Sequence, residues 1–245
     1  MSDPQGLAFS SLAEDYDRGR YGWPAQIAAG VEATTVLDLA AGTGKLTGLL
    51  AARYPEVIAV EPLVTMRSLL EQRVPEARAL AGSAEAIPLD DASVDAVFVA
   101  EAFHWFDSNA AAQEIARVLR PGGWLVVCFN EWRGGFRPQP PEKARAYWRE
   151  VTSGLPAAGG HKLATGDWRR GLRAFEPLDE VAIDHEWQTD ARGVAAYYAS
   201  VSSLGSVDPE QREQWRDRLI GLIPPGRYEL SLTARVYTGN LSAGS

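Results

Sequence analysis

Val36-Leu-Asp-Leu-Ala-Ala-Gly-Thr-Gly-Lys-Leu-Thr47 is the stretch that decides the fold of this 245-residue chain. It begins as an apolar run, which is typical of a strand buried on both faces of a parallel sheet. Gly42 and Gly44 then form a turn, and a helical pattern starts at Lys45. A strand, a glycine-rich turn and a helix together bring the backbone close to a nucleotide-like ligand. Asp38 interrupts the apolar strand, so we take it as a candidate ligand contact.

Similar apolar segments recur along the first half of the chain and alternate with helical patterns. The predicted strands span residues 36–39, 56–61, 77–81, 94–100 and 124–129, and the predicted helices span 7–20, 24–31, 45–53, 63–73 and 108–119. A sharp turn is expected at 120–123. Strands that alternate with helices in this way predict a doubly wound α/β fold with a parallel sheet.

The second half of the chain does not continue this regular alternation of strands and helices. Prolines and glycines at 134–141 indicate a linker. We then expect two helical pieces within 142–175, a strand at 181–187, helices at 192–203 and 209–223, and a last strand at 228–237.

Composition narrows the class of protein. A net charge of −8 argues against a general nucleic-acid binder, which needs a basic surface. The single Cys128 excludes an intrachain disulfide and a cysteine-rich metal site. The first residues lack the pattern of a signal peptide, and no apolar run approaches the ~20 residues of a membrane span. We therefore expect a cytoplasmic protein with no metal, no nucleic-acid partner and no membrane partner.

A carboxylate at the end of the second predicted strand narrows the choice of nucleotide-like ligand. Glu61 lies 19 residues after Gly42, at the distance where nucleotide-binding folds place a ribose-binding carboxylate. A dinucleotide fingerprint requires a third glycine where this chain has Thr47, and the phosphate-binding loop motif is absent. The upstream Asp38 suits a cation better than a pyrophosphate. These features favour S-adenosylmethionine over NAD.

Four motifs then resemble those of class I S-adenosylmethionine-dependent methyltransferases. They are the opening stretch, Ala59-Val-Glu-Pro62, Gly82-Ser-Ala-Glu-Ala-Ile-Pro-Leu89 and Ala116-Arg-Val-Leu-Arg-Pro-Gly-Gly123, in the family's order. The resemblance implies a Rossmann-like, seven-stranded, mostly parallel sheet with an antiparallel last strand. It also implies one methyltransferase domain over 1–245, with a cofactor-binding core at 32–130 and a helical cap or lid, formed by 1–31 and 131–180, over the acceptor site.

The resemblance also assigns roles to single residues. The cofactor-binding residues that it implies are Asp38, Ala40, Gly42, Gly44, Glu61, Pro62, Met66, Ser83, Ala84, Glu85, Glu101, Ala102 and Tyr16. Ser83 stands where many relatives have Asp, so a hydroxyl, or else the Ala84 backbone with the Glu85 side chain, would contact the adenine.

The segment Glu101-Ala-Phe-His-Trp-Phe106 follows the fourth predicted strand. It resembles a small-molecule subgroup that includes trans-aconitate methyltransferases. That resemblance makes His104 a candidate general base, with core packing as the alternative role. The acceptor-binding residues that it implies are Arg20, Tyr21, His104 and Trp105. Trp132 is added because the region after residue 130 is rich in tryptophan and arginine, which suits a pocket for an apolar or carboxylated molecule.

We therefore predict methyl transfer from S-adenosylmethionine to an O, N or C atom of a small-molecule acceptor, a carboxylate among the candidates. The protein would act mainly through proximity and orientation. The alternative is a non-catalytic S-adenosylmethionine-binding or regulatory protein of the same fold. The acceptor and the oligomeric state stay open.

Overall fold

The computed structural model describes residues 17–155, 167–200, 204 and 207–242. Most of the helix predicted at 7–20, including Tyr16, lies outside the described residues. Within them, seven strands form one sheet in the order β3-β2-β1-β4-β5-β7-β6. The strands are β1 (Thr35–Leu39), β2 (Glu56–Val60), β3 (Arg78–Leu80), β4 (Val94–Ala100), β5 (Leu119–Trp132), β6 (Asp179–Asp190) and β7 (Arg227–Asn240).

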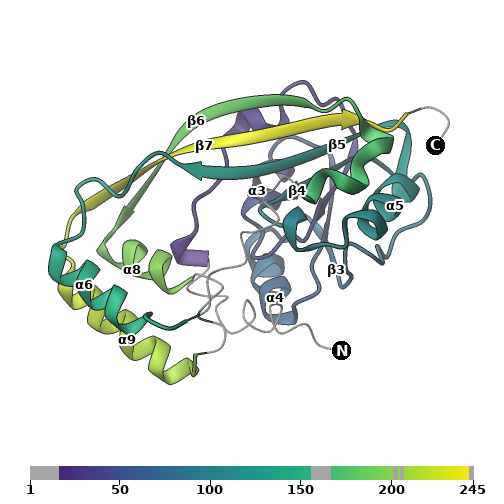
Figure 1. Ribbon diagram of the computed structural model, residues 1–245. Helices are drawn as coiled ribbons and strands as arrows, with labels where there is room; N and C mark the ends of the chain where they lie inside the picture. The colour runs from purple at the N-terminus through teal and green to yellow at the C-terminus, as the bar shows by residue number, and fades with distance from the viewer. Residues whose placement is uncertain (1–16, 156–166, 201–203, 205–206, 243–245) are drawn as a thin grey trace. The chain divides into compact units, whose positions relative to one another are not determined.

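The first five strands are parallel, and β7 runs in the opposite direction to its neighbour β5 (Figure 1). The predicted mostly parallel, seven-stranded sheet with an antiparallel last strand is therefore confirmed. The helical elements are η1 (Ala25–Ala28), α3 (Lys45–Ala51), α4 (Val64–Arg73), η2 (Phe103–Trp105), α5 (Ser108–Val118), α6 (Glu142–Val151), η3 (Asp167–Phe175), α8 (Ala191–Ala199) and α9 (Pro209–Leu222).

The chain divides into two compact units. The sheet unit contains the described residues of 23–131, 160–183 and 234–245, and the helical unit contains those of 1–22, 132–159 and 184–233. These boundaries differ from the predicted cap at 1–31 and 131–180. Residues 167–180 group with the sheet because η3 packs on α5, and residues 23–31 do so because Ile27, Ala28 and Val31 join the other core. Residues 184–233 add α8 and α9 to the helical unit.

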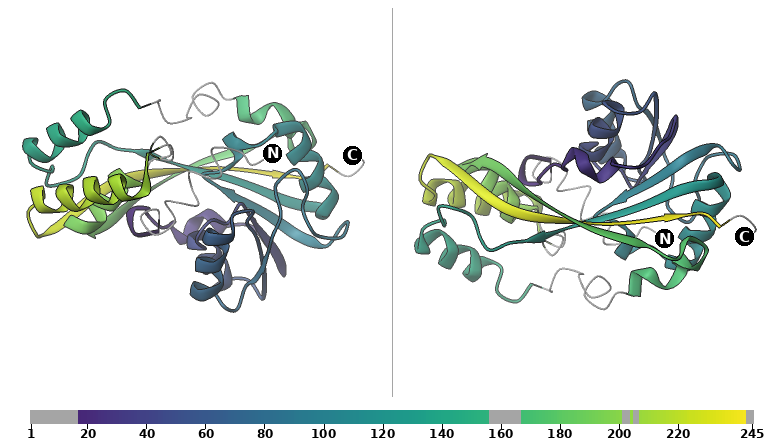
Figure 2. Two further views of the ribbon diagram at one scale, coloured as in Figure 1. Left: turned by 90° about the horizontal axis from the view of Figure 1, so that it is seen from below. Right: turned by 90° about the horizontal axis from the view of Figure 1, so that it is seen from above.

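Alternate residues of the central strands face two cores in the sheet unit. One core contains Leu37, Val97 and Val127 with residues of α5 and η3, and the other contains Val36, Phe98 and Val126 with residues of α3 and η1. Figure 2 shows α5 and η3 on the side of the sheet opposite α3. This two-residue period places Asp38 on the face that α3 covers, because Asp38 shares its side of β1 with Val36.

Two predicted boundaries were wrong. The helix expected at 24–31 is only the short 3-10 turn η1, because Gly30 adopts a φ of +78° soon after it. The turn expected at 120–123 is a bulge inside β5: Val94 pairs with Leu119, but Ala96, two residues later on β4, pairs with Trp124. Extra residues on one strand of a pair are the defining feature of a bulge.

Candidate functional site

The strand order places the candidate site at the carboxyl ends of β1 and β4. The chain winds from β1 toward β2 and β3, and then returns to the other side of β1 with β4. Open α/β sheets bind ligands outside the strand ends at such a switch point. Ala40 and Glu101 follow these two strands with φ of +58° and +56°. Left-handed conformations of residues with a Cβ are strained, and such strain concentrates at functional sites.

Asp38 lies at this point as a buried carboxylate. Its exposed fraction is 1%, and its Oδ2 accepts a 2.6 Å hydrogen bond from the Thr47 hydroxyl of α3. Burial raises the pKa of Asp38 from 3.8 to about 7, although the Thr47 hydrogen bond opposes the shift; the charge of Glu61 raises the pKa further. A positively charged ligand would therefore find a carboxylate that ionises near neutral pH.

The raised pKa predicts how Asp38 affects the stability of the ligand-free protein. The folded state holds the proton up to about pH 7, whereas the unfolded chain releases it near 3.8. Stability from this group is thus fully present below the unfolded pKa and is lost as the pH rises through the folded pKa, by up to about 4 kcal/mol. Asp38→Asn lacks this loss, so in urea denaturation the stability of the variant relative to the wild type should rise between about pH 4 and 7. A difference in unfolding free energy that stays constant with pH would contradict the raised pKa.

Glu61 follows β2 and is held by the backbone. Its Oε2 accepts from the Gly42 amide and its Oε1 from the Leu63 amide, both at 2.9 Å. The side chain is 5% exposed, and burial raises its pKa despite these two hydrogen bonds. A carboxylate has about four acceptor positions. Each oxygen of Glu61 therefore keeps acceptor capacity beyond its backbone partner, in a fixed orientation.

The turn between β1 and α3 has the unusual backbone that its glycines predict. Gly42 and Gly44 have φ of +58° and +86°. A Cβ at Gly44 would also lie 3.1 Å from the Leu70 side chain of α4, so α4 approaches this turn closely. Arg73 donates to the carbonyl of Thr43 at 3.2 Å and so ties the end of α4 to the same turn. Pro62 is exposed before α4 and Met66 is buried within α4.

The loop after β3 carries the three residues predicted to contact adenine. Ser83 pairs with Ala86 across a tight turn, and Ala84 is buried. The carboxylate of Glu85 accepts from the Asp107 amide at 3.1 Å, immediately before α5. This contact gives Glu85 a structural role that the sequence did not indicate; its contact with adenine stays a prediction.

The segment after β4 carries the candidate base. The Glu101 carboxylate accepts a 2.7 Å hydrogen bond from the backbone N–H of Asn130, and Ala102 is buried. His104 is 9% exposed, and its ring lies 4.7 Å from the Trp105 ring and 5.8 Å from that of Phe129, measured between centroids. Further aromatic residues pack around this group, namely Phe103, Phe106, Trp168 and Tyr237. His104 therefore lies in an apolar setting beside the switch point.

The other predicted acceptor contacts belong to the helical unit. Arg20 donates to the Ser200 carbonyl at 3.2 Å and lies over the Tyr197 ring, while Tyr21 is buried. Trp132 is 55% exposed, with its ring 5.3 Å from that of Tyr197. The structure groups these side chains around one aromatic cluster of the helical unit. Their contact with an acceptor stays a prediction.

Sequence reasoning missed several residues that fix the site. Thr47 was noted only as the substitute for a third glycine, yet it holds Asp38. Arg67 donates to the carbonyl of Glu61 at 2.8 Å. Thr47 lies nine residues after Asp38, in the first turn of the helix that follows the glycine turn, and this spacing could have suggested the first contact. No sequence signal pointed to the second.

Comparisons with known proteins agree with this geometry. Residues 37–127 match the model of a family described as "Methyltransferase domain". The chain is 40% identical over 176 residues to an uncharacterised methyltransferase-like protein of Schizosaccharomyces pombe, covering 63% of this chain and 68% of that protein. It is 49% identical over 127 residues to an uncharacterised methyltransferase of Mycobacterium tuberculosis, covering 51% of this chain and 52% of that protein. The match thus spans about half the length of the mycobacterial relative.

Among solved structures, a candidate type II methyltransferase from Anaeromyxobacter dehalogenans has the same fold. Its TM-score is 0.60 at 22% identity, and the match covers 91% of this chain and 98% of that one. In the part of the chain that the structure describes, no group of three or more His, Cys, Asp or Glu side chains is placed to hold a metal ion. No helix in that part is long and apolar enough to cross a membrane.

Proposed function

Because the chain belongs to the family of class I S-adenosylmethionine-dependent methyltransferases, we propose that it methylates a small molecule and holds the methyl donor at the carboxyl ends of β1, β2 and β4. The observation that carries this proposal is a pair of buried carboxylates beside the glycine turn. Asp38 lies near the carboxyl end of β1, and Glu61 directly follows the neighbouring strand β2. Buried carboxylates are costly unless a cation or hydrogen-bond donors compensate them.

The residues present fit S-adenosylmethionine. Its ribose offers two hydroxyl donors, which suit the remaining acceptor positions of Glu61. Its amino and sulfonium groups are positive, which suits Asp38. Asp38, Ala40, Gly42 and Gly44 would hold the methionine end, with Glu101 and Ala102 on the β4 side. Pro62, Met66, Ser83 and Ala84 would surround the adenine, and Tyr16 would cover the donor.

When bound, the donor supplies an electrophilic methyl group on a sulfonium. The chain's own residues have a simpler task, which is to align the acceptor and exclude water. Alignment alone lowers a barrier by roughly 7–11 kcal/mol in favourable cases. No covalent intermediate with a protein side chain is needed.

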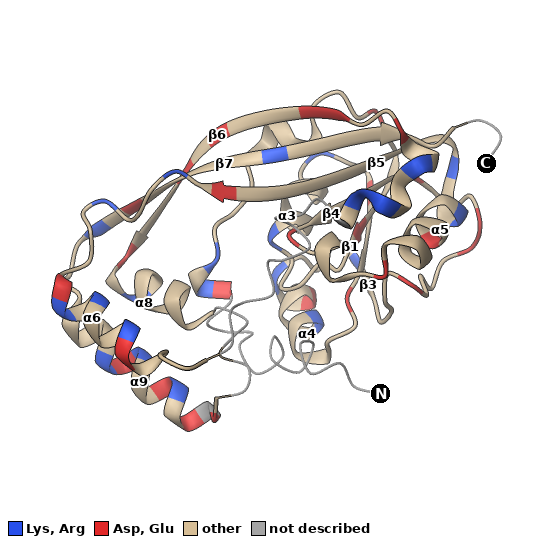
Figure 3. Cartoon of the chain, viewed as in Figure 1, with Lys and Arg blue, Asp and Glu red and all other residues tan. Residues whose placement is uncertain are grey.

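His104 is the proposed general base, because it lies just after β4 and histidine is the side chain that most often transfers protons in enzymes. The Ala-Phe-His-Trp-Phe segment also supports an acceptor of the kind used by the trans-aconitate methyltransferase-like subgroup. Arg20, Tyr21, Trp105 and Trp132 would contact that acceptor. A small molecule is favoured over nucleic acid because the chain carries a net charge of −8, and acidic residues are interspersed with the basic ones along α6 and α9 (Figure 3).

Turnover is the test of this function. The full chain with S-adenosylmethionine should bind the donor in calorimetry and form S-adenosylhomocysteine with at least one member of a panel of carboxylic acids, phenols and amines. Donor binding without turnover on the whole panel would favour the non-catalytic alternative. A wild-type chain that binds no donor would overturn the proposal.

The same assay tests His104. With an active acceptor, His104→Gln should lower kcat by about 100-fold or more and leave donor affinity unchanged, because a base acts on the acceptor. Phe129→Leu is the matched control, since it removes the other ring that packs beside His104 without removing a base. A His104→Gln variant with wild-type kcat would leave this histidine with its packing role only.

A further inference from the structure

Helix α5 holds both ends of the loop that carries Ser83, Ala84 and Glu85. At the start of the helix, the Asp107 amide donates to the Glu85 carboxylate. At its last turn, Arg117 and Glu114 form hydrogen bonds with the loop two to six residues beyond Glu85. We call residues 82–91 the adenine loop, after the role proposed for it above.

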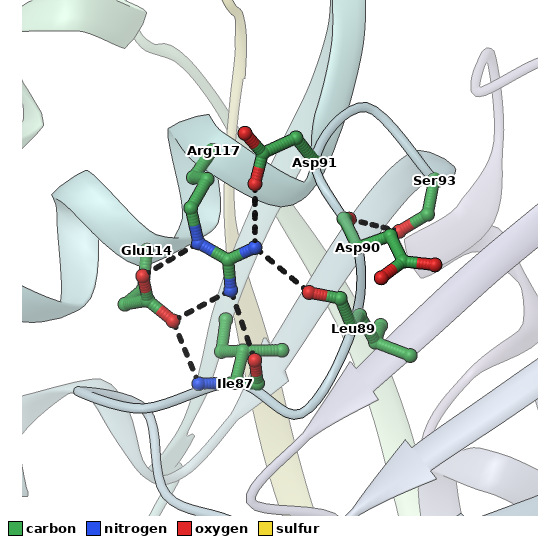
Figure 4. A network of polar contacts seen from close by, with 7 residues as sticks. All are labelled: Ile87, Leu89, Asp90, Asp91, Ser93, Glu114 and Arg117. Carbon is green, nitrogen blue, oxygen red and sulfur yellow. Dashed lines mark hydrogen bonds and ion pairs between the residues drawn. The ribbon is translucent and has the colours of Figure 1, made fainter.

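Arg117 is the centre of this second attachment (Figure 4). Its guanidinium donates to the carbonyls of Ile87 at 2.9 Å and Leu89 at 2.7 Å. It also donates to Asp91 at 2.9 Å and, through two nitrogens, to Glu114 at 2.7 and 2.8 Å. Arginine has five N–H donors in a fixed planar arrangement. These five contacts use all of them.

Glu114 completes the attachment. The oxygen that accepts from Arg117 at 2.8 Å also accepts from the Ile87 amide at 2.8 Å. Ile87 is therefore held through both its amide and its carbonyl by two residues one helical turn apart. The Arg117 ion pair lowers the pKa of Glu114, which keeps this acceptor ionised. Lysine could not replace Arg117, because it has three donors and no planar fork.

We propose that Arg117 is a positioning residue for donor binding, and that it acts by fixing the adenine loop in its binding conformation before the ligand arrives. A preformed loop lowers the ordering cost that binding otherwise includes. This role rests on the proposed function. Arg117 touches the loop and not the residues assigned to the methionine end, so it should affect every ligand that carries adenosine to the same degree.

The test compares two ligands and two matched variants by calorimetry on the full chain. Arg117→Lys should weaken S-adenosylhomocysteine and adenosine by the same factor, about tenfold. Arg120→Lys is the control, because Arg120, at the start of β5, forms its ion pair with Asp95, at the start of β4 and outside the adenine loop. Its affinities should stay within about twofold of wild type. A role in stability alone would lower the unfolding midpoint of both variants and leave both affinities unchanged.

The other possible results also test the positioning role of Arg117. Wild-type affinity in Arg117→Lys, or a loss confined to S-adenosylhomocysteine, would overturn the positioning role. If Arg117→Lys does not fold, Glu114→Gln takes its place and should weaken both ligands by about threefold, since the amide keeps an acceptor for Ile87; unchanged affinity would overturn the role. If the wild type binds neither ligand, the proposed function itself fails. Binding by the wild type with an unaffected Arg117→Lys variant removes this inference alone.

Discussion

Glu61→Gln is expected to weaken S-adenosylmethionine binding by about 100-fold or more. The carboxylate would accept from both ribose hydroxyls, and each such charge-assisted hydrogen bond contributes about 1.5–3 kcal/mol. In the wild type the backbone N–H groups of Gly42 and Leu63 donate to the two Glu61 oxygens. The glutamine side chain would replace one of these oxygens with an NH2 group, so one of the two N–H groups would face another donor. The variant therefore loses ligand contacts and disturbs the turn that presents them. Calorimetric titration with the donor measures the effect.

Glu56→Gln is the matched control for this prediction. Glu56 begins the same strand that Glu61 follows, and it also has a polar partner, the Thr35 hydroxyl at 2.9 Å. It lies at the amino end of β2, away from the ligand crevice, so its replacement should leave donor affinity unchanged. Equal losses in both variants would indicate a general defect of the sheet. Unchanged affinity in Glu61→Gln would remove Glu61 from the donor site.

Gly171→Ala is expected to destabilise the protein by about 3 kcal/mol. A Cβ at Gly171 would lie 2.0 Å from the Ser108 carbonyl oxygen and 2.5 Å from its carbon, which are backbone atoms of α5. The contact can be relieved only if η3 moves away from α5. In a chain of this size the unfolding midpoint should fall by roughly 6–12 °C. Thermal unfolding followed by circular dichroism checks the value.

Gly221→Ala provides the opposite expectation. Gly221 lies in α9, and nothing is within 4 Å of the Cβ that alanine would add. Alanine should stabilise a helical position of this kind by about 0.5–1 kcal/mol. A Gly171→Ala variant as stable as Gly221→Ala would contradict the close packing of η3 on α5. That packing also positions Trp168, whose ring is 5.9 Å from Phe103, next to the proposed base.

The sheet and the outline of the donor site could be predicted from local patterns. Apolar runs bounded by glycine and proline identified the parallel strands, because strands buried on both faces are apolar throughout. Carboxylates at the strand ends, Asp38 and Glu61, stood out against those runs. Parallel strands end at one edge of a sheet, so the two were expected to converge there, and both are buried at that edge.

Contacts between elements could not be predicted in this way. The hydrogen bond from Thr47 to Asp38 depends on how α3 lies over β1, and the five contacts of Arg117 depend on how the adenine loop crosses α5. The bulge around Gly122 is defined by how β5 pairs with β4, and this pairing is not encoded in the local sequence pattern. The bounds of the two units could not be predicted from local patterns, because the long strands β5 and β7 contribute residues to both.

The central claim is that the carboxyl ends of β1, β2 and β4 hold the methyl donor. A crystal structure of the full chain with S-adenosylhomocysteine tests it most directly. We predict that the ribose hydroxyls contact the Glu61 carboxylate, that the adenine lies beside Ser83 and Ala84, and that the amino group of the ligand faces Asp38. S-adenosylhomocysteine bound elsewhere on the chain, with Glu61 still held only by the Gly42 and Leu63 amides, would contradict the claim.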